Sequence, residues 1–194
     1  MESFHELVSG NERFVAGQGG VAYSQIQIAE VADAPAPIAA VIGCIDSRTA
    51  PEIIFDQGLG RLFVTRTPGN VAADSVKWML EIAVGELGVP LIVIMAHTRC
   101  LAVRQIIEGK LSGPGGFLRM SIGTAVMRAQ SRLPEDLERE ALIENAIQTA
   151  AILRAESHIV RDALDQDRVA IAIALYHVET GRIEWIESPI SDSS

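Results

Sequence analysis

Basic residues are scarce in this chain. Lysine and arginine together number 16 among 194 residues, against 25 aspartates and glutamates, which gives a formal net charge of −9 at pH 7. No cluster of basic residues offsets this balance. Such a surface does not attract nucleic acid, so we exclude nucleic-acid binding. The charge is compatible with a small neutral substrate, or with a small anion drawn in by a few local positive charges.

Long apolar runs are also missing. Apolar runs such as Pro90 to Ala96 are far shorter than the about 20 residues that a membrane helix needs, so we expect no membrane partner. No N-terminal segment combines a basic start, an apolar stretch and a small-residue cleavage site. We therefore expect a cytoplasmic protein.

Cysteine is nearly absent. Cys44 and Cys100 are the only two, they lie far apart in the sequence, and neither belongs to a CxxC pair, which argues against a thiol-redox protein. A single disulfide and two inert buried thiols are both compatible with this count, although disulfides are rare in the cytosol. A metal-binding or catalytic role needs further residues beside them.

What the chain does contain is an alternation of apolar runs and amphipathic helical patterns. This alternation predicts an α/β fold, a single domain over residues 1–194 with a central, mainly parallel β-sheet flanked by helices. Residues 1–37 would form an N-terminal helix followed by a looped arm, and residues 38–194 the α/β core. The expected strands are 38–44, 61–66, 90–96, 169–178 and 182–187, and one long helix is expected over 135–166.

Three potential metal ligands fall at one edge of this sheet. Cys44 ends the first expected strand, His97 ends the third, and Cys100 begins the helix that follows. Ligands of parallel sheets bind beyond the carboxyl ends of the strands. Two thiolates and an imidazole suit zinc, and three protein ligands leave a fourth position open. A lone histidine or buried cysteine is more often structural, but their coincidence with the neighbouring Asp46 and Arg48 favours a metal site.

The segments "CIDSR" (Cys44 to Arg48) and "HTRC" (His97 to Cys100) resemble the C-x-D-x-R and H-x-x-C motifs of β-class carbonic anhydrases. The resemblance extends over nearly the whole chain, through the segments "LVSGNERFVAG", "APEIIFDQGLGRLFVTRTPGNV", "EIAVGELGVPLIVIMAHTRC" and "LYHVETGRI".

The resemblance implies one Zn²⁺ per subunit, bound by Cys44, His97 and Cys100. Asp46 would be the fourth ligand only in a closed state. In the open state Arg48 would hold Asp46 away, so that water or hydroxide takes the fourth place. The implied reaction is the reversible hydration of CO2 to bicarbonate and a proton by zinc-hydroxide attack. An Asp–Arg pair two residues apart can also be a plain structural salt bridge.

The resemblance also carries expectations about substrate and assembly. Gly69 and Asn70, in the loop "TPGNV", would lie near the pocket and bind substrate, although a plain strand-to-helix turn is an equal alternative. The chain would form a homodimer or a dimer of dimers, with its N-terminal helical arm packing on a partner subunit. Its apolar face, formed by Phe4, Leu7 and Phe14, needs a surface to lie against.

Several positions depart from the family pattern. The glycines usual before the histidine ligand and after the second cysteine are Ala96 and Leu101, and the glutamine of many plant-type members is Pro35. A regulatory bicarbonate pocket of some bacterial members uses Trp, Arg and Tyr; the corresponding residues are Val41, Arg66 and Tyr176. His177 replaces the usual aspartate of the C-terminal hairpin.

These departures leave two alternatives open. The same zinc site could hydrolyse the CO2 analogues COS or CS2, which a more apolar pocket beside Leu101 would suit. A catalytically silent zinc protein, closed by Asp46, is the other alternative, against which the presence of Arg48 argues.

Overall fold

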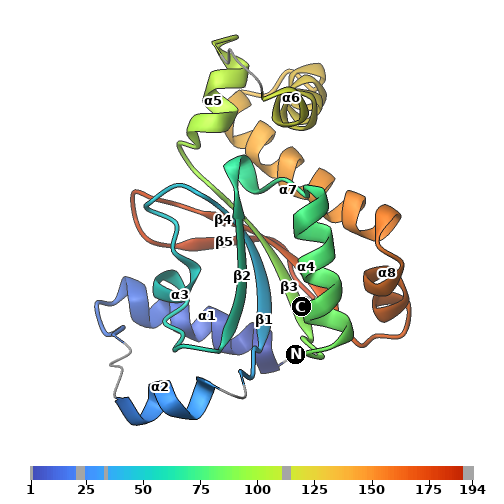
Figure 1. The fold of residues 1–194 in the computed structure, drawn as a ribbon. Helices are drawn as coiled ribbons and strands as arrows, with labels where there is room; N and C mark the ends of the chain where they lie inside the picture. The colour runs from blue at the N-terminus through green and yellow to red at the C-terminus, as the bar shows by residue number, and fades with distance from the viewer. Residues whose placement is uncertain (1, 21–24, 33–34, 111–114, 190–194) are drawn as a thin grey trace, which may run out of the picture.

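The computed structural model describes residues 2–20, 25–32, 35–110 and 115–189. Its centre is a five-stranded sheet with the strand order β2-β1-β3-β4-β5 (Figure 1). The first four strands in chain order pair in parallel, and the last forms an antiparallel hairpin with its predecessor. The bounds are β1 Ala39–Cys44, β2 Leu62–Thr67, β3 Leu91–His97, β4 Ala170–Tyr176 and β5 Ile183–Glu187. The prediction of an α/β fold with a mainly parallel sheet is confirmed.

Helices cover both faces of the sheet (Figure 1). One face packs against α4, α7 and α8, and the other against α1 and α3. The helices α5 and α6 pack against α7 past the carboxyl end of β3. The bounds are α1 Glu2–Val15, α2 Gln25–Ala32, α3 Pro51–Ile54, α4 Asp74–Gly85, α5 Leu101–Ile107, α6 Gly116–Ser131, α7 Leu137–Glu156 and α8 His158–Asp165, with a single 3-10 turn, η1, at Pro68–Asn70.

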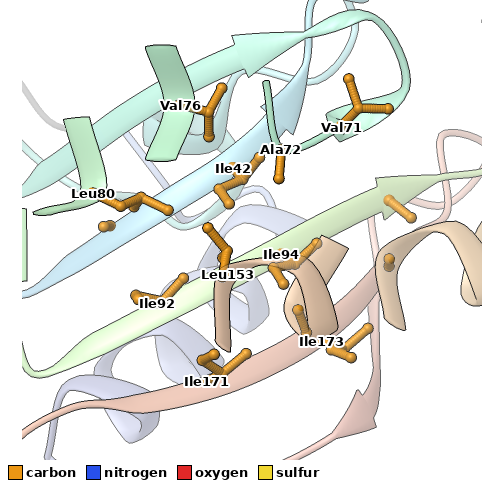
Figure 2. Close-up of a cluster of buried hydrophobic side chains, with 14 of the residues drawn as sticks. Ile42, Val71, Ala72, Val76, Leu80, Ile92, Ile94, Leu153, Ile171 and Ile173 are labelled. Carbon is orange, nitrogen blue, oxygen red and sulfur yellow. The ribbon is translucent and has the colours of Figure 1, made fainter. Parts of the chain in front are cut away.

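The central strands are apolar throughout because both of their faces are covered. Every residue of β1 and of β3 is buried. Figure 2 shows the core between the sheet and its longer helices, where Ile42, Ile92 and Ile173 point toward Leu80 and Leu153. Since side chains alternate along a strand, Cys44 lies on the same face as Ile42. The first cysteine is therefore directed into the core under α4 and α7.

Two expectations about helices were wrong. The helix predicted over 135–166 is broken at Ser157, which adopts an extended conformation. The Ser157 hydroxyl accepts from the Val160 N–H at 3.2 Å and so caps α8, which favours a new helix start over a continuous helix. Within the expected looped arm, the residues Gln25–Ala32 form the helix α2.

The helix α1 packs against the sheet of its own chain. Phe4 and Leu7 are buried, and the ring of Phe4 lies 4.5 Å from that of Trp185 in β5. Asn11 donates to the carbonyls of Ile54 and Gly181 and accepts from the Ile183 N–H. The apolar face of α1 thus meets a surface within one chain, and its packing on a partner subunit remains an expectation.

Within the described ranges, none of the helices combines the length and the apolar character needed to cross a membrane.

Candidate metal centre

The structure brings Cys44, His97 and Cys100 together. Their sulfur and nitrogen donor atoms all lie within 4.8 Å of one another, and all three residues are buried. Cys44 is the last residue of β1, His97 is the last residue of β3, and Cys100 is the N-cap of α5. The three residues therefore lie together at the carboxyl edge of the sheet, as the expected strand ends predicted.

A tight reversal of the chain brings Cys100 back beside His97. Arg99, between them, has a φ of 56°, a conformation that non-glycine residues seldom adopt. Glu179 stabilises this reversal, because it accepts from the Thr98 hydroxyl at 2.7 Å and forms an ion pair with Arg99. The spacing of the HTRC segment thus depends on a backbone conformation that its neighbours hold in place.

The ring of His97 is prepared for a metal. Its Nδ1 lies 2.9 Å from the carbonyl oxygen of Thr98, which can only accept, so Nδ1 carries the proton and Nε2 keeps a lone pair. Nε2 is buried and has no hydrogen-bond partner among the described residues. An unpaired buried polar atom costs about 1–3 kcal/mol, a penalty that a metal bond at Nε2 would remove. This orphaned nitrogen beside two sulfurs fits zinc.

The thiols of Cys44 and Cys100 are hydrogen-bonded to each other, and each shifts the pKa of the other. A hydrogen bond with Cys100, and further ones from the backbone N–H groups of Asp46 and Gly69, lower the pKa of Cys44, although burial opposes the shift. The same bond with Cys44, together with burial, raises the pKa of Cys100. The hydrogen bond between the two sulfurs thus favours the thiolate form of Cys44 and the protonated form of Cys100. A thiolate is the form of cysteine that binds metal.

Asp46 and Arg48 form a bidentate pair beside these ligands. Arg48 Nε donates to one carboxylate oxygen of Asp46 at 2.9 Å, and Nη2 donates to the other at 2.7 Å. This guanidinium, with the Arg48 backbone N–H, holds the pKa of Asp46 well below its usual range. Arg48 Nη2 also donates to the carbonyl of Arg99, at 3.3 Å. The carboxylate of Asp46 is therefore ionised at neutral pH, and Arg48 fixes its orientation.

Two further residues fix the loop that carries Asp46. Arg66 donates to the carbonyl of Cys44 at 2.7 Å and also to that of Asp46. The Thr49 hydroxyl lies 3.0 Å and 2.9 Å from the same two carbonyl oxygens. Arg66 matches one position of the regulatory pocket of some bacterial members, but its guanidinium binds backbone carbonyls in this chain, and Val41 is fully buried in β1. Thr49 was missed, although a threonine so soon after a strand end often caps the loop.

Gly69 and Asn70 lie against the cysteine ligand. The Gly69 N–H lies 3.4 Å from the sulfur of Cys44, and both turn residues have positive φ, 65° and 48°. A Cβ on Gly69 would lie 2.9 Å from Cδ1 of Ile122, so this position requires glycine. Asn145 and Thr149 hold the turn from α7. Sequence reasoning missed them, although two polar residues four apart on an apolar helix face were a usable signal.

The residues that depart from the family pattern lie in different surroundings. Ala96 is buried in β3. Leu101 begins α5 with its side chain 65% exposed in this single chain. Pro35 is exposed, and His177 lies 3.0 Å from a carboxylate oxygen of Glu184.

A family model described as carbonic anhydrase matches residues 39–183. The chain belongs to the carbonic anhydrase family. It is 37% identical over 181 residues to Carbonic anhydrase 2 of Mycobacterium tuberculosis, which covers 91% of this chain and 87% of the relative. It is 38% identical over 185 residues to a carbonic anhydrase of Mycolicibacterium smegmatis, with 92% and 89% covered.

Solved structures of β-carbonic anhydrases share the fold of this carbonic anhydrase. The Coccomyxa β-carbonic anhydrase, determined with acetazolamide, has a TM-score of 0.75 at 24% identity and covers 84% of this chain and 77% of its own. The β-carbonic anhydrase CcaA has a TM-score of 0.76 at 21% identity, with 94% of both chains covered. The predicted resemblance to the β class is confirmed.

Proposed function

We propose that this carbonic anhydrase catalyses the reversible hydration of CO2 to bicarbonate and a proton, with one Zn²⁺ per subunit held by Cys44, His97 and Cys100. One observation carries the proposal: in a chain of this family, a buried imidazole nitrogen that has no hydrogen-bond partner among the described residues lies beside two thiols. Bound zinc would lower the pKa of a water from 15.7 to about 7 and so supply a nucleophile at neutral pH.

The protein's own residues orient that reaction. Asp46 is ionised and can accept a hydrogen bond from the attacking water, which directs a lone pair at the carbon of CO2. Arg48 fixes the carboxylate by its bidentate contact. Gly69 and Asn70, next to Cys44, are the proposed substrate neighbours. If Arg48 released Asp46, the carboxylate would be free to bind a metal held by the three candidate ligands and so close the site.

We further propose a homodimer or a dimer of dimers in the cytoplasm, each subunit as one domain over residues 1–194. Exposed apolar side chains on α5 and α6 support a contact with another subunit. They include Leu101, Phe117 and Met120. A structural neighbour from Sordaria macrospora is described as tetrameric. Two buried free thiols suit a reducing compartment.

Stopped-flow CO2 hydration of metal-analysed protein tests the reaction. At about pH 8, where a water with a pKa of about 7 is ionised, we expect turnover well above buffer in the zinc-loaded protein and none after chelation. A fully zinc-loaded sample with no rate above buffer would overturn the proposal in favour of a silent zinc protein. If sulfide were released from COS or CS2 faster than CO2 is hydrated, COS or CS2 would replace CO2 as the proposed substrate.

A further inference from the structure

The turn η1 connects a metal ligand to a helix that contributes no ligand itself. Gly69 donates its backbone N–H toward the sulfur of Cys44. The carbonyl of the same residue accepts a hydrogen bond of 2.6 Å from the amide nitrogen of Asn145, in α7. One turn below, the Thr149 hydroxyl donates to the carbonyl of Asn70 at 3.1 Å. A side chain on α7 therefore holds each of the two turn residues next to the cysteine.

This turn needs such support. Gly69 and Asn70 are consecutive residues in the left-handed region, and Asn70 is not glycine. Both carbonyl contacts are sheltered from water, since Asn145 and Thr149 are each only 1% exposed. Hydrogen bonds at both carbonyls fix the backbone dihedral angles of the turn, and those angles determine the direction of the Gly69 N–H.

The side-chain amide of Asn145 is only partly satisfied in its buried position. Its side-chain oxygen is buried and has no hydrogen-bond partner within the described part of the chain. An apolar residue of similar size would remove that unpaired acceptor but would leave the Gly69 carbonyl without its donor. The residue thus supplies one directed donor to the Gly69 carbonyl at the expense of an unpaired acceptor.

We propose that Asn145 and Thr149 are positioning residues that keep the Gly69 N–H on the Cys44 sulfur and so strengthen the retention of the metal. The inference rests on the proposed zinc site, although not on the identity of the substrate. A hydrogen bond to a ligating thiolate lowers its charge and fixes its orientation, and partners of metal ligands commonly change metal affinity 10- to 100-fold when they are removed.

The same helix offers a matched control. Gln148 is also a nearly buried amide, donates to the backbone carbonyl of Ser121 at 2.9 Å, and leaves its own oxygen without a partner among the described residues. Its bond joins α7 to α6 and does not reach the turn. Gln148→Leu therefore removes an equivalent interaction without changing the surroundings of Cys44.

The test compares Asn145→Leu, Thr149→Val, Thr149→Ser and Gln148→Leu in the full-length protein. Zinc affinity is measured by competition with a chelator, and the thiolate-to-metal absorption band is recorded after Co²⁺ loading. We expect Asn145→Leu and Thr149→Val to bind zinc about tenfold more weakly and to shift the Co²⁺ band. Thr149→Ser, which keeps the hydroxyl, and Gln148→Leu should match the parent in both measurements.

Equal zinc affinity in Asn145→Leu and Gln148→Leu would overturn the inference. If Asn145→Leu does not fold, Thr149→Val and Thr149→Ser decide alone, and equal affinities in those two would overturn it as well. Failure of the proposed function gives a different pattern, because a parent that binds zinc but does not hydrate CO2 still shows the differences between variants. Normal CO2 hydration with unchanged zinc affinity in every variant removes only the positioning role.

Discussion

Two arginine–aspartate pairs of this chain have similar contacts and lie in different regions. Arg48 and Asp46 lie two residues apart at the carboxyl end of β1, beside the candidate metal ligands. Arg13 and Asp56 are distant in sequence, and their 2.6 Å contact joins α1 to the segment after α3. In both pairs the guanidinium lowers the pKa of the carboxyl.

The difference lies in what else each carboxylate touches. Asp56 also accepts from the Gly20 N–H, so it connects three segments of the chain. Among the contacts described, the carboxylate of Asp46 accepts only from Arg48, through its guanidinium and its backbone N–H. Arg66 and Thr49 hold the carbonyls of the same loop, so the Asp46 carboxylate connects no distant segment of the chain. One pair maintains the fold, and the other leaves a charged group free for chemistry.

The largest expected effect is on CO2 hydration, and it should distinguish the Arg48–Asp46 pair from the Arg13–Asp56 pair. Asp46→Asn should reduce CO2 hydration about 10- to 100-fold, because the amide loses the negative charge and half of the acceptor capacity next to the metal. Its stability should stay near that of the parent, since Arg48 is 47% exposed and an exposed ion pair contributes little.

Stopped-flow assays at equal zinc content check this effect, with Asp56→Asn as the matched control that should keep parental activity. Full activity in Asp46→Asn would show that both pairs are merely structural.

The next largest expected effect is on stability, and it concerns Asn11, in the same region as Arg13 and Asp56. Asn11→Leu should lower the free energy of unfolding by about 2–3 kcal/mol, because it leaves two carbonyls and one N–H unpaired in the α1 interface. Urea denaturation measures the loss as a lower midpoint at constant slope. The exposed neighbour Glu12→Gln is the control and should change little. A large drop in zinc affinity of the folded Asn11→Leu protein would contradict the separation of the two regions.

The smallest effect concerns the pH dependence of the Arg13–Asp56 pair. Asp56→Asn should cost about 1 kcal/mol near neutral pH. Because Arg13 and the Gly20 N–H lower the folded pKa of Asp56, its stabilisation is complete above the unfolded value of about 3.9 and disappears as pH falls through the folded pKa.

Parent and Asp56→Asn should therefore differ in midpoint at neutral pH and converge in acid. Urea titrations at a series of pH values test this, and a constant gap down to the most acidic point would rule out the charge as its source.

Local sequence patterns predicted much of the architecture. The apolar runs around Ile42, Ile94 and Ile173 gave the central strands, since a strand buried on both faces has no polar positions to obscure it. The three candidate ligands followed from the same strands, because parallel strands end at one edge. The break at Ser157 was missed because the helical pattern continues on both sides of a single capping residue.

The contacts that refine the site could not be predicted in the same way. Asn145 contacts Gly69, which lies 76 positions away in the sequence. No local pattern predicts that α7 packs close to η1. Arg66 meets Cys44 through the pairing of β1 with β2, so its role depends on the register of the sheet. Such contacts depend on tertiary packing, which a single sequence encodes only indirectly.

The order of the strands also sets an order of events during folding. β1 and β3 are neighbours in the sheet, yet β2 and α4 lie between them in the chain. Cys44 therefore meets His97 only after a long segment has closed and two non-consecutive strands have paired, a step with a high entropic cost. The three donor atoms do not exist as a group in a partly folded chain. A metal bound by all three donors would therefore stabilise the pairing of β1 with β3, because it could bind all three only once these strands have met.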